Sequence, residues 1–168
     1  PRKISSEYPG IIFDYSDDYY RLGGASNVAN NISKFNVEVD LLCVVGKDNF
    51  TDIFYKELNN AGINTDYVIE DSSYKTIVKE RYCSSDYKQI MRVDYEKTNI
   101  DCHDTLYNYL ERAFKNRYDL VIVSDYRKGV VTNEFYEKII SLAKENNIKV
   151  ICDPKDGVVN YKDLFILK

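Results

Sequence analysis

Short apolar runs alternate along this chain with stretches in which apolar residues recur at helical spacing. Residues 120–124 and 149–153 carry such runs, and residues 132–143 between them repeat at a period near that of a helix. Continuous apolar runs are typical of strands that helices cover on both faces. The order strand, helix, strand therefore predicts parallel strands with helices packed on the sheet. A helix over 105–115 precedes these elements, and a further strand begins at Phe165.

The first half of the chain shows the same alternation. Residues 37–46 alternate at first and then run continuously apolar, which predicts a strand that enters a covered sheet. Apolar positions at helical spacing predict helices over 25–35 and 51–61, and residues 67–69 predict a short strand. The two helices are expected to end at Asn36 and Gly62.

Two further pairs of short strands have no helix between their members. Residues 11–15 and 18–21 flank a Ser-Asp turn, and residues 74–82 and 87–93 flank the turn 83–86. Both pairs are rich in β-branched and aromatic residues, and residues 1–9 before them are expected to form an irregular arm. These strands are therefore predicted to form a small sheet attached to the α/β core.

One partial domain is expected to include all 168 residues. Its α/β core comprises residues 24–70 and 100–168, and the strands of the small sheet lie within 10–22 and 74–94. Because the chain begins with Pro1 and ends just after an apolar run, we expect it to be an internal fragment of a longer domain.

Composition and charge exclude several function classes. The formal net charge of −4 and the lack of a dense Lys/Arg run argue against a nucleic-acid partner. No apolar stretch approaches the length of a membrane span and no leader peptide opens the chain, so neither a membrane partner nor secretion is expected. The four cysteines have no C-x-x-C spacing and there is a single histidine, so we expect no metal site and a cytoplasmic location.

The glycine pair at Gly23-Gly24 has the layout of a small polar-ligand site. Glycines let backbone amides approach a ligand, and a helix that starts directly afterwards aims its free N–H groups at the same place. Asn27, in the first helical turn, can add a side-chain amide. Sugar hydroxyls or a phosphate are suitable ligands, and the alternative is a tight turn that needs glycine only for packing.

Charged residues follow three of the predicted parallel strands, where ligands of α/β proteins bind. Asp125 and Lys128 follow the strand at 120–124, and Lys155 follows the strand at 149–153. Carboxylates at such ends can bind sugar hydroxyls, and lysines can bind phosphate. Gly46-Lys47-Asp48 follows the first strand and has ordinary turn composition. The alternative for each group is a turn or capping aspartate beside a solvated lysine.

The predicted hairpin concentrates positive charge in an acidic chain. Lys79 and Arg81 share one face of a strand because they are two residues apart, and Arg92 lies on the partner strand. These cations could hold an anionic substrate or could simply protect a solvated edge strand. Asp94 and Glu96 could form an acid/base pair, although caps of the following loop are the simpler interpretation.

Taken together and in order, several segments resemble the ribokinase-like (PfkB) carbohydrate kinases, and within them the D-glycero-β-D-manno-heptose-7-phosphate kinases. The matching segments are residues 2–9, 23–32, 45–48, 76–81, 89–96, 124–129 and 153–155. The resemblance implies a three-layer α/β/α core with a mostly parallel sheet, and a small β-sheet lid over the sugar that can mediate a homodimer.

The resemblance also implies roles for single residues. Gly23, Gly24 and Asn27 would line the acceptor-sugar site, and Lys79, Arg81 and Arg92 on the lid would hold the phosphate of the substrate. Asp125, Lys128 and Lys155 would face the same cleft from the strand ends. The partner is then a small sugar phosphate.

Parts of the family pattern are not found among these 168 residues. The family's Gly-Ala-Gly-Asp anion hole with its catalytic Asp is expected beyond Lys168, so no catalytic residue is assigned here. ATP and Mg²⁺ would serve the intact enzyme without dedicated residues in this chain. We therefore expect a sugar-kinase segment, inactive alone, that carries the acceptor site. The alternative is a non-catalytic sugar-phosphate-binding or interaction module; a dinucleotide-binding dehydrogenase is set aside because G-x-G-x-x-G is missing.

Overall fold

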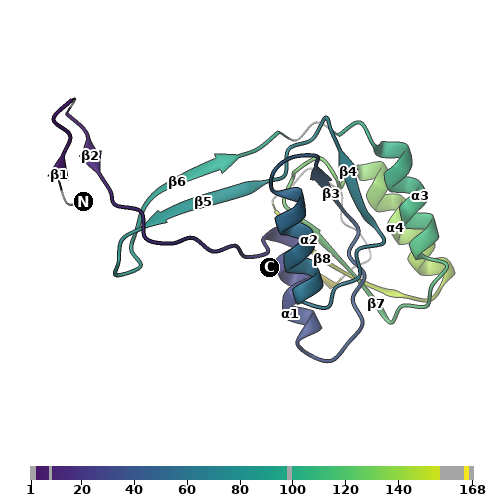
Figure 1. Ribbon diagram of the computed structural model, residues 1–168. Helices are drawn as coiled ribbons and strands as arrows, with labels where there is room; N and C mark the ends of the chain where they lie inside the picture. Colours follow the sequence, from purple (N-terminus) through teal and green to yellow (C-terminus); the bar gives the residue numbers. More distant parts are fainter. Residues whose placement is uncertain (1–2, 8, 98–99, 156–164, 167–168) are drawn as a thin grey trace.

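The computed structural model describes residues 3–7, 9–97, 100–155 and 165–166 (Figure 1). Helices and strands alternate along most of the chain, as the sequence predicts. The elements are β1 (Lys3–Ile4), β2 (Ile11–Ile12), α1 (Gly24–Ser33), β3 (Cys43–Gly46), α2 (Thr51–Asn60), β4 (Val68–Asp71), β5 (Val78–Cys83), β6 (Gln89–Tyr95), α3 (His103–Ala113), β7 (Leu120–Asp125), α4 (Asn133–Glu145), β8 (Lys149–Pro154) and β9 (Phe165–Ile166).

The core strands are parallel. β3 pairs with β4 so that Cys43 lies opposite Val68, and β7 pairs with β8 so that Leu120 lies opposite Lys149. β9 continues the second sheet on the other edge of β8. Parallel neighbours need a crossover connection, and α2 and α4 supply it between the members of these pairs. The expectation of an α/β fold with a mostly parallel core is confirmed.

Helices cover both faces of the core strands, which gives three layers (Figure 1). Neighbouring residues of β3 point to opposite faces, so Val45 packs in a cluster with α1 and α2 whereas Val44 packs with α3 and α4. The first cluster contains Ala29 and Leu58. The second contains Leu106, Leu110, Phe135, Ile139 and Ala143. Both faces are therefore apolar, as the continuous runs predict.

Strands β5 and β6 form an antiparallel hairpin that extends away from this core (Figure 1). Lys79 lies opposite Asp94 and Arg81 lies opposite Arg92. Most residues of the hairpin are exposed. The predicted strands over 74–82 and 87–93 thus lie close to the observed ones.

The predicted strand pair over 11–15 and 18–21 is wrong. Only Ile11–Ile12 forms a strand, β2, and its partner is β1, which lies in the arm expected to be irregular. Residues 13–23 have no helix or strand. Three aspartates within 14–18 disfavour a strand there.

Helix ends follow local signals in the sequence. Asn36 and Gly62, expected to end the first two helices, have positive φ angles of 55° and 68°. Thr132 begins α4, and its side chain accepts a hydrogen bond from the Phe135 amide.

Within the described part of the chain, no helix is both long and apolar enough to cross a lipid bilayer.

Candidate functional site

The start of α1 faces the loop that follows β7. Gly24 has a φ of +54°, a left-handed conformation that strains any other residue. A Cβ on Gly24 would lie 3.6 Å from the Tyr126 ring, so the two segments are close. The carbonyl of Gly23 accepts hydrogen bonds from the Ser26 hydroxyl at 2.7 Å and from the backbone N–H of Asn27 at 3.3 Å. The glycine pair therefore shapes the turn and exposes the helix start.

A large hollow of about 2920 Å³ opens beside this helix start. Gly23, Gly24 and Asn27 line it, together with Lys79, Arg81, Asp125 and Lys128. Asn27 is exposed and also lines a smaller hollow of about 430 Å³ between α1 and α2. Seven of the nine expected substrate-binding residues thus border one continuous space; Arg92 and Lys155 do not line it.

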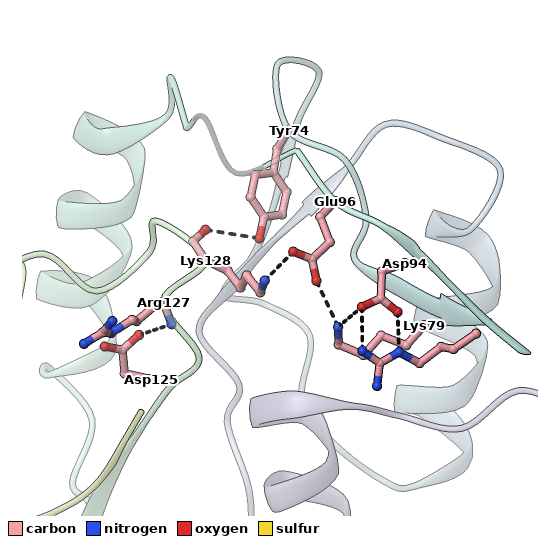
Figure 2. A network of polar contacts seen from close by, with 8 residues as sticks. Tyr74, Lys79, Asp94, Glu96, Asp125, Arg127 and Lys128 are labelled. Atoms are coloured by element: carbon pink, nitrogen blue, oxygen red, sulfur yellow. Dashed lines mark hydrogen bonds and ion pairs between the residues drawn. The ribbon is translucent and has the colours of Figure 1, made fainter. Parts of the chain in front are cut away.

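Glu96 joins the hairpin to the core through two lysines (Figure 2). One carboxylate oxygen lies 2.9 Å from Lys79 Nζ on β5, and the other pairs with Lys128 Nζ in the loop after β7. Lys79 Nζ also lies 2.9 Å from Asp94. Two lysines that are 49 positions apart in the sequence therefore meet at one carboxylate.

The two arginines of the hairpin differ in their partners. Arg92 makes a two-pronged contact with Asp94, with Nε at 2.8 Å and Nη2 at 3.1 Å. Arg81 donates from Nη1 to the Lys79 carbonyl at 3.2 Å and, within the described residues, forms no ion pair with a carboxylate. Arg81 is exposed. Its guanidinium therefore keeps most of its donors for a ligand.

The ion pairs shift the pKa values of Glu96, Asp94 and Lys79. The Lys128 ammonium, followed by that of Lys79, holds the pKa of Glu96 below its ordinary value of 4.5. Lys79, with Arg92, lowers the pKa of Asp94. Reciprocally, Glu96 and Asp94 raise the pKa of Lys79. Glu96, Asp94 and Lys79 are therefore charged at neutral pH.

Asp125 is buried at the carboxyl end of β7, with a relative exposure of 6%. Its Oδ1 accepts a hydrogen bond from the Arg127 amide at 2.7 Å, and its carbonyl accepts one from the Lys155 amide at 3.0 Å. The Tyr74 hydroxyl donates to the Lys128 carbonyl at 3.3 Å. The backbones of Asp125, Lys128 and Lys155 are thus brought to one edge of the sheet, although the Lys155 side chain is exposed.

A second set of polar contacts anchors the base of the hairpin to the end of β3. Asp48 accepts hydrogen bonds from the Phe50 amide at 3.0 Å and from the Thr76 amide at 2.9 Å. The Gly46 amide donates to Thr76 Oγ1 at 3.1 Å. A Cβ on Gly46 would lie 2.6 Å from the Asp48 carboxylate, so glycine is required there. For Asp48 the turn interpretation is therefore correct.

Glu96 and Asp94 are the functional candidates that sequence reasoning undervalued. The sequence leaves open whether they form an acid/base pair or cap the following loop; in the structure they are counter-ions of the two lysines and of Arg92. The alternation of charge across the hairpin, with Lys79 opposite Asp94, is a signal that could have identified them.

Among the described residues, no three His, Cys, Asp or Glu side chains form a metal-binding group.

Comparison with known proteins gives matches along nearly the whole chain. Residues 15–165 match the family described as pfkB family carbohydrate kinase. The bifunctional protein HldE of Aliarcobacter butzleri is 35% identical over 156 residues, which are 91% of this chain and 32% of that protein. HldE of Helicobacter hepaticus is 36% identical over the same share. The chain therefore spans about a third of the length of these relatives.

Solved structures show the same fold at lower identity. A PfkB family carbohydrate kinase from Listeria grayi has a TM-score of 0.57 at 22% identity, with 83% of this chain and 43% of that one covered. A fructokinase from Xylella fastidiosa with bound ATP has a TM-score of 0.57 at 19% identity, with 83% and 41% covered.

Proposed function

Because this chain belongs to the pfkB family of carbohydrate kinases, we propose that its described residues bind the sugar that accepts a phosphoryl group. The hollow bordered by the start of α1, the hairpin and the loop after β7 would hold the sugar. In such a reaction the protein acts mainly by positioning and by electrostatic stabilisation. This chain would supply the positioning of the acceptor.

The convergence of Lys79 and Lys128 on the Glu96 carboxylate carries this proposal (Figure 2). Arg92 pairs with Asp94, which is also a partner of Lys79. The three cations come from β5, β6 and the loop after β7, and Arg81 adds a fourth beside them. A phosphate group offers three acceptor oxygens and close to two negative charges. It can replace Glu96 and Asp94 as the partner of these cations, because charge-assisted hydrogen bonds to phosphate are strong.

The hydroxyl groups of the sugar would lie at the other side of the hollow. The positive end of α1 and the side chain of Asn27 offer donors there, and the Asp125 carboxylate offers an acceptor. Ser124 also lines the hollow, and its buried hydroxyl has no hydrogen-bond partner among the described residues. A phosphate site at the hairpin and polar groups at the strand ends suit a phosphorylated sugar.

The specific acceptor we propose is heptose-7-phosphate. Its support is the resemblance of the sequence segments to heptose-7-phosphate kinases, together with the cations of the hairpin. ATP would donate the phosphoryl group in the intact protein, in the cytoplasm. The roles proposed for the residues of this chain concern the sugar alone.

Calorimetric titration of the chain with heptose-7-phosphate and with the unphosphorylated heptose tests the proposal. Arg81→Ala should weaken binding of the phosphorylated sugar about 10- to 100-fold, the value of one or two charge-assisted hydrogen bonds. Binding of the unphosphorylated sugar should not change. Lys88→Ala is the matched control, because Lys88 lies at the hairpin tip and pairs only with Asp86 among the described residues. Equal losses for both sugars, or for both variants, would contradict a phosphate site.

We further propose that the hairpin mediates a homodimer. Alternation places Tyr82, Met91, Val93 and Tyr95 on the face opposite to the cations, and Tyr82, Met91 and Tyr95 are 45%, 51% and 44% exposed. A two-stranded hairpin is marginally stable by itself, so a second copy packed on this face would stabilise it. Met91→Lys should raise the dimer dissociation constant in sedimentation analysis, whereas Lys88→Ala should leave it unchanged.

A further inference from the structure

The anion that pairs with the two lysines of the hollow belongs to the protein itself. Lys79 and Lys128 line the hollow, whereas Glu96 does not. One carboxylate oxygen of Glu96 lies 2.9 Å from Lys79 Nζ, and the other pairs with Lys128 Nζ (Figure 2). A phosphate that enters the hollow therefore finds both ammonium groups occupied.

Lys128 depends on Glu96 more than Lys79 does. Lys79 Nζ has a second partner, because it also lies 2.9 Å from Asp94. Lys128 forms no second ion pair with a carboxylate of the described residues. Its backbone is held independently, since its carbonyl accepts a hydrogen bond from the Tyr74 hydroxyl at 3.3 Å. A change of partner thus needs only the side chain of Lys128 to move.

The Glu96 side chain is placed to give up its partners. The side chains of Glu96 and Lys128 are 27% and 25% exposed, so a displaced carboxylate can turn to water and is not left buried without a partner. Ion pairs that water reaches contribute little to stability, so a ligand can compete with this one. A phosphate offers close to two negative charges and three acceptor oxygens, against the single charge of Glu96.

The two ends of the hairpin are anchored by different kinds of contact. Before β5, the buried Thr76 donates from its amide to Asp48 at 2.9 Å and accepts at Oγ1 from the Gly46 amide at 3.1 Å. After β6, Glu96 reaches the core through its ion pair with Lys128. Loss of that ion pair would keep the first end fixed and free the second, which lets the hairpin pivot about Thr76.

We propose that Glu96 is an autoinhibitory contact of the phosphate site: it occupies Lys128 and Lys79 until a ligand phosphate displaces it, and its displacement releases the second end of the hairpin. The inference rests on the phosphate site of the proposed function and adds its regulation. Because Glu96 must leave before an anion binds the lysines, it reduces the affinity for every such anion by one common factor. Uncharged ligands leave the ion pair intact.

Removal of the Glu96 charge tests this exclusion. NMR titrations at about pH 7.5 and about 0.15 M salt would use methyl phosphate, a dianion, and methyl sulfate, a monoanion of similar shape. Glu96→Gln should bind both about 3- to 10-fold more tightly than the parent chain does, and by the same factor. Glu111→Gln is the matched control, since Glu111 also pairs with a lysine, Lys138, and neither residue lines the hollow. Its affinities should equal those of the parent.

Four results would overturn the proposal. Weaker binding of both anions by Glu96→Gln would show that Glu96 holds the lysines in place for the ligand. A gain that grows with the charge of the anion would indicate repulsion at a distance, and unchanged affinities would show that the anion binds without displacing Glu96. No binding of methyl phosphate to either chain would remove the phosphate site. These probes contain no sugar, so failure of heptose-7-phosphate to bind would contradict the proposed acceptor alone.

A second measurement does not depend on the Glu96 variant. In the parent chain, methyl phosphate should shift the carboxyl carbon signal of Glu96 and increase the mobility of β5 and β6 in backbone nitrogen relaxation. Lys128→Met, in which the ion pair is already absent, should show no such increase. A hairpin that becomes no more mobile when methyl phosphate saturates the parent chain would contradict the release of its second end.

Discussion

Single side chains at the strand ends decide how this chain closes its turns. Asp71, at the end of β4, is 7% exposed and accepts hydrogen bonds from the Ser73 amide and hydroxyl at 2.8 and 2.6 Å. Its other oxygen accepts from the amides of Asp101 and Cys102 at 2.9 and 3.2 Å, where α3 begins. Burial acts to raise the pKa of Asp71, but these hydrogen bonds outweigh it and hold the pKa far below its usual range.

Asp71→Asn should therefore reduce the free energy of unfolding at neutral pH by about 2 kcal/mol, because buried amides lose a charged acceptor. The pKa of Asp71 is lowered in the folded state, so its contribution is complete above the ordinary value of 3.8 and is lost as the pH falls through the lower folded value. Urea unfolding at several pH values measures this contribution. The difference in the free energy of unfolding between Asp71→Asn and the parent chain should shrink in acid. The control Asp66→Asn, at an exposed carboxyl, should differ little from the parent chain at any pH.

The glycine pair offers a matched comparison of two neighbouring residues. Gly24 has a φ of +54°, whereas Gly23 has a φ of −122° and no atom within 4 Å of a Cβ built on it. Gly24→Ala should cost about 1–2 kcal/mol of stability through backbone strain. Gly23→Ala should cost much less. Thermal unfolding of both variants measures the difference, and equal melting temperatures would contradict the left-handed conformation at Gly24.

Asn27 tests the sugar end of the proposed site. If its amide binds a sugar hydroxyl, Asn27→Ala should raise the dissociation constant for the proposed sugar about 5- to 100-fold, the range expected when a buried group loses its partner. Asn30, one turn further on and bordering only the smaller hollow, supplies the control Asn30→Ala. Unchanged sugar binding in Asn27→Ala would remove Asn27 from the site.

At the scale of elements, the hairpin is held to the core by a few polar contacts at its base. Thr76 binds the end of β3, and Glu96 binds Lys128 in the loop after β7. The hairpin itself is largely exposed, so these contacts decide its direction. A ligand phosphate that takes the place of Glu96 would pair with Lys128 and so break the ion pair that joins the hairpin to the loop.

The carboxyl titration of Glu96 measures this link directly. In the parent chain, carbon-detected NMR should place the pKa of Glu96 below 4.5, because Lys128 and Lys79 favour the charged form. Lys128→Met should raise that pKa toward 4.5, and Lys88→Met should leave it unchanged. Since the pKa is lowered in the folded state, the contribution of the link to stability is present above 4.5 and is lost as the pH falls through the folded value. A pKa of Glu96 that does not respond to Lys128→Met would show that the two side chains do not pair.

At the scale of the whole molecule, we expect the 168-residue chain to bind sugar phosphate without transferring a phosphoryl group. No Gly-Ala-Gly-Asp segment occurs in it, and removal of even one anion-stabilising donor costs a factor of about 100–1,000 in rate. An assay of ADP release with ATP and heptose-7-phosphate should show no sugar-dependent turnover. Sugar-dependent release at an ordinary kinase rate would show that the catalytic groups lie within these residues.

A second experiment, expression of the reading frame that contains these residues, tests the binding-module alternative. If these residues are a sugar-kinase segment, a reading frame that contains them together with the anion hole and its aspartate should show activity when expressed. A binding module would retain sugar-phosphate binding, and its reading frame would contain no such motif. The two outcomes separate the candidates without any assumption about the sugar.

The sequence by itself determined the features that depend on neighbouring residues. Apolar spacing predicted the helices and the parallel strands, because burial of one face or both imposes a period on the side chains. Asn36, Gly62 and Thr132 mark helix ends for local reasons, namely a positive φ or a side-chain acceptor. The ordered motifs also predicted the kinase family that the whole-chain comparison confirms.

Only the tertiary structure decided which distant residues meet. The pairing of β2 with β1 rather than with residues 18–21 depends on which segments meet in the fold, and the sequence pattern predicted only the pairing with residues 18–21. The carboxylate of Glu96 meets Lys79 and Lys128 because the hairpin returns to the strand ends, and no local pattern encodes that distance. The partner of each core strand is likewise a property of the whole fold, since an apolar run shows that a strand is buried but not which strand lies beside it.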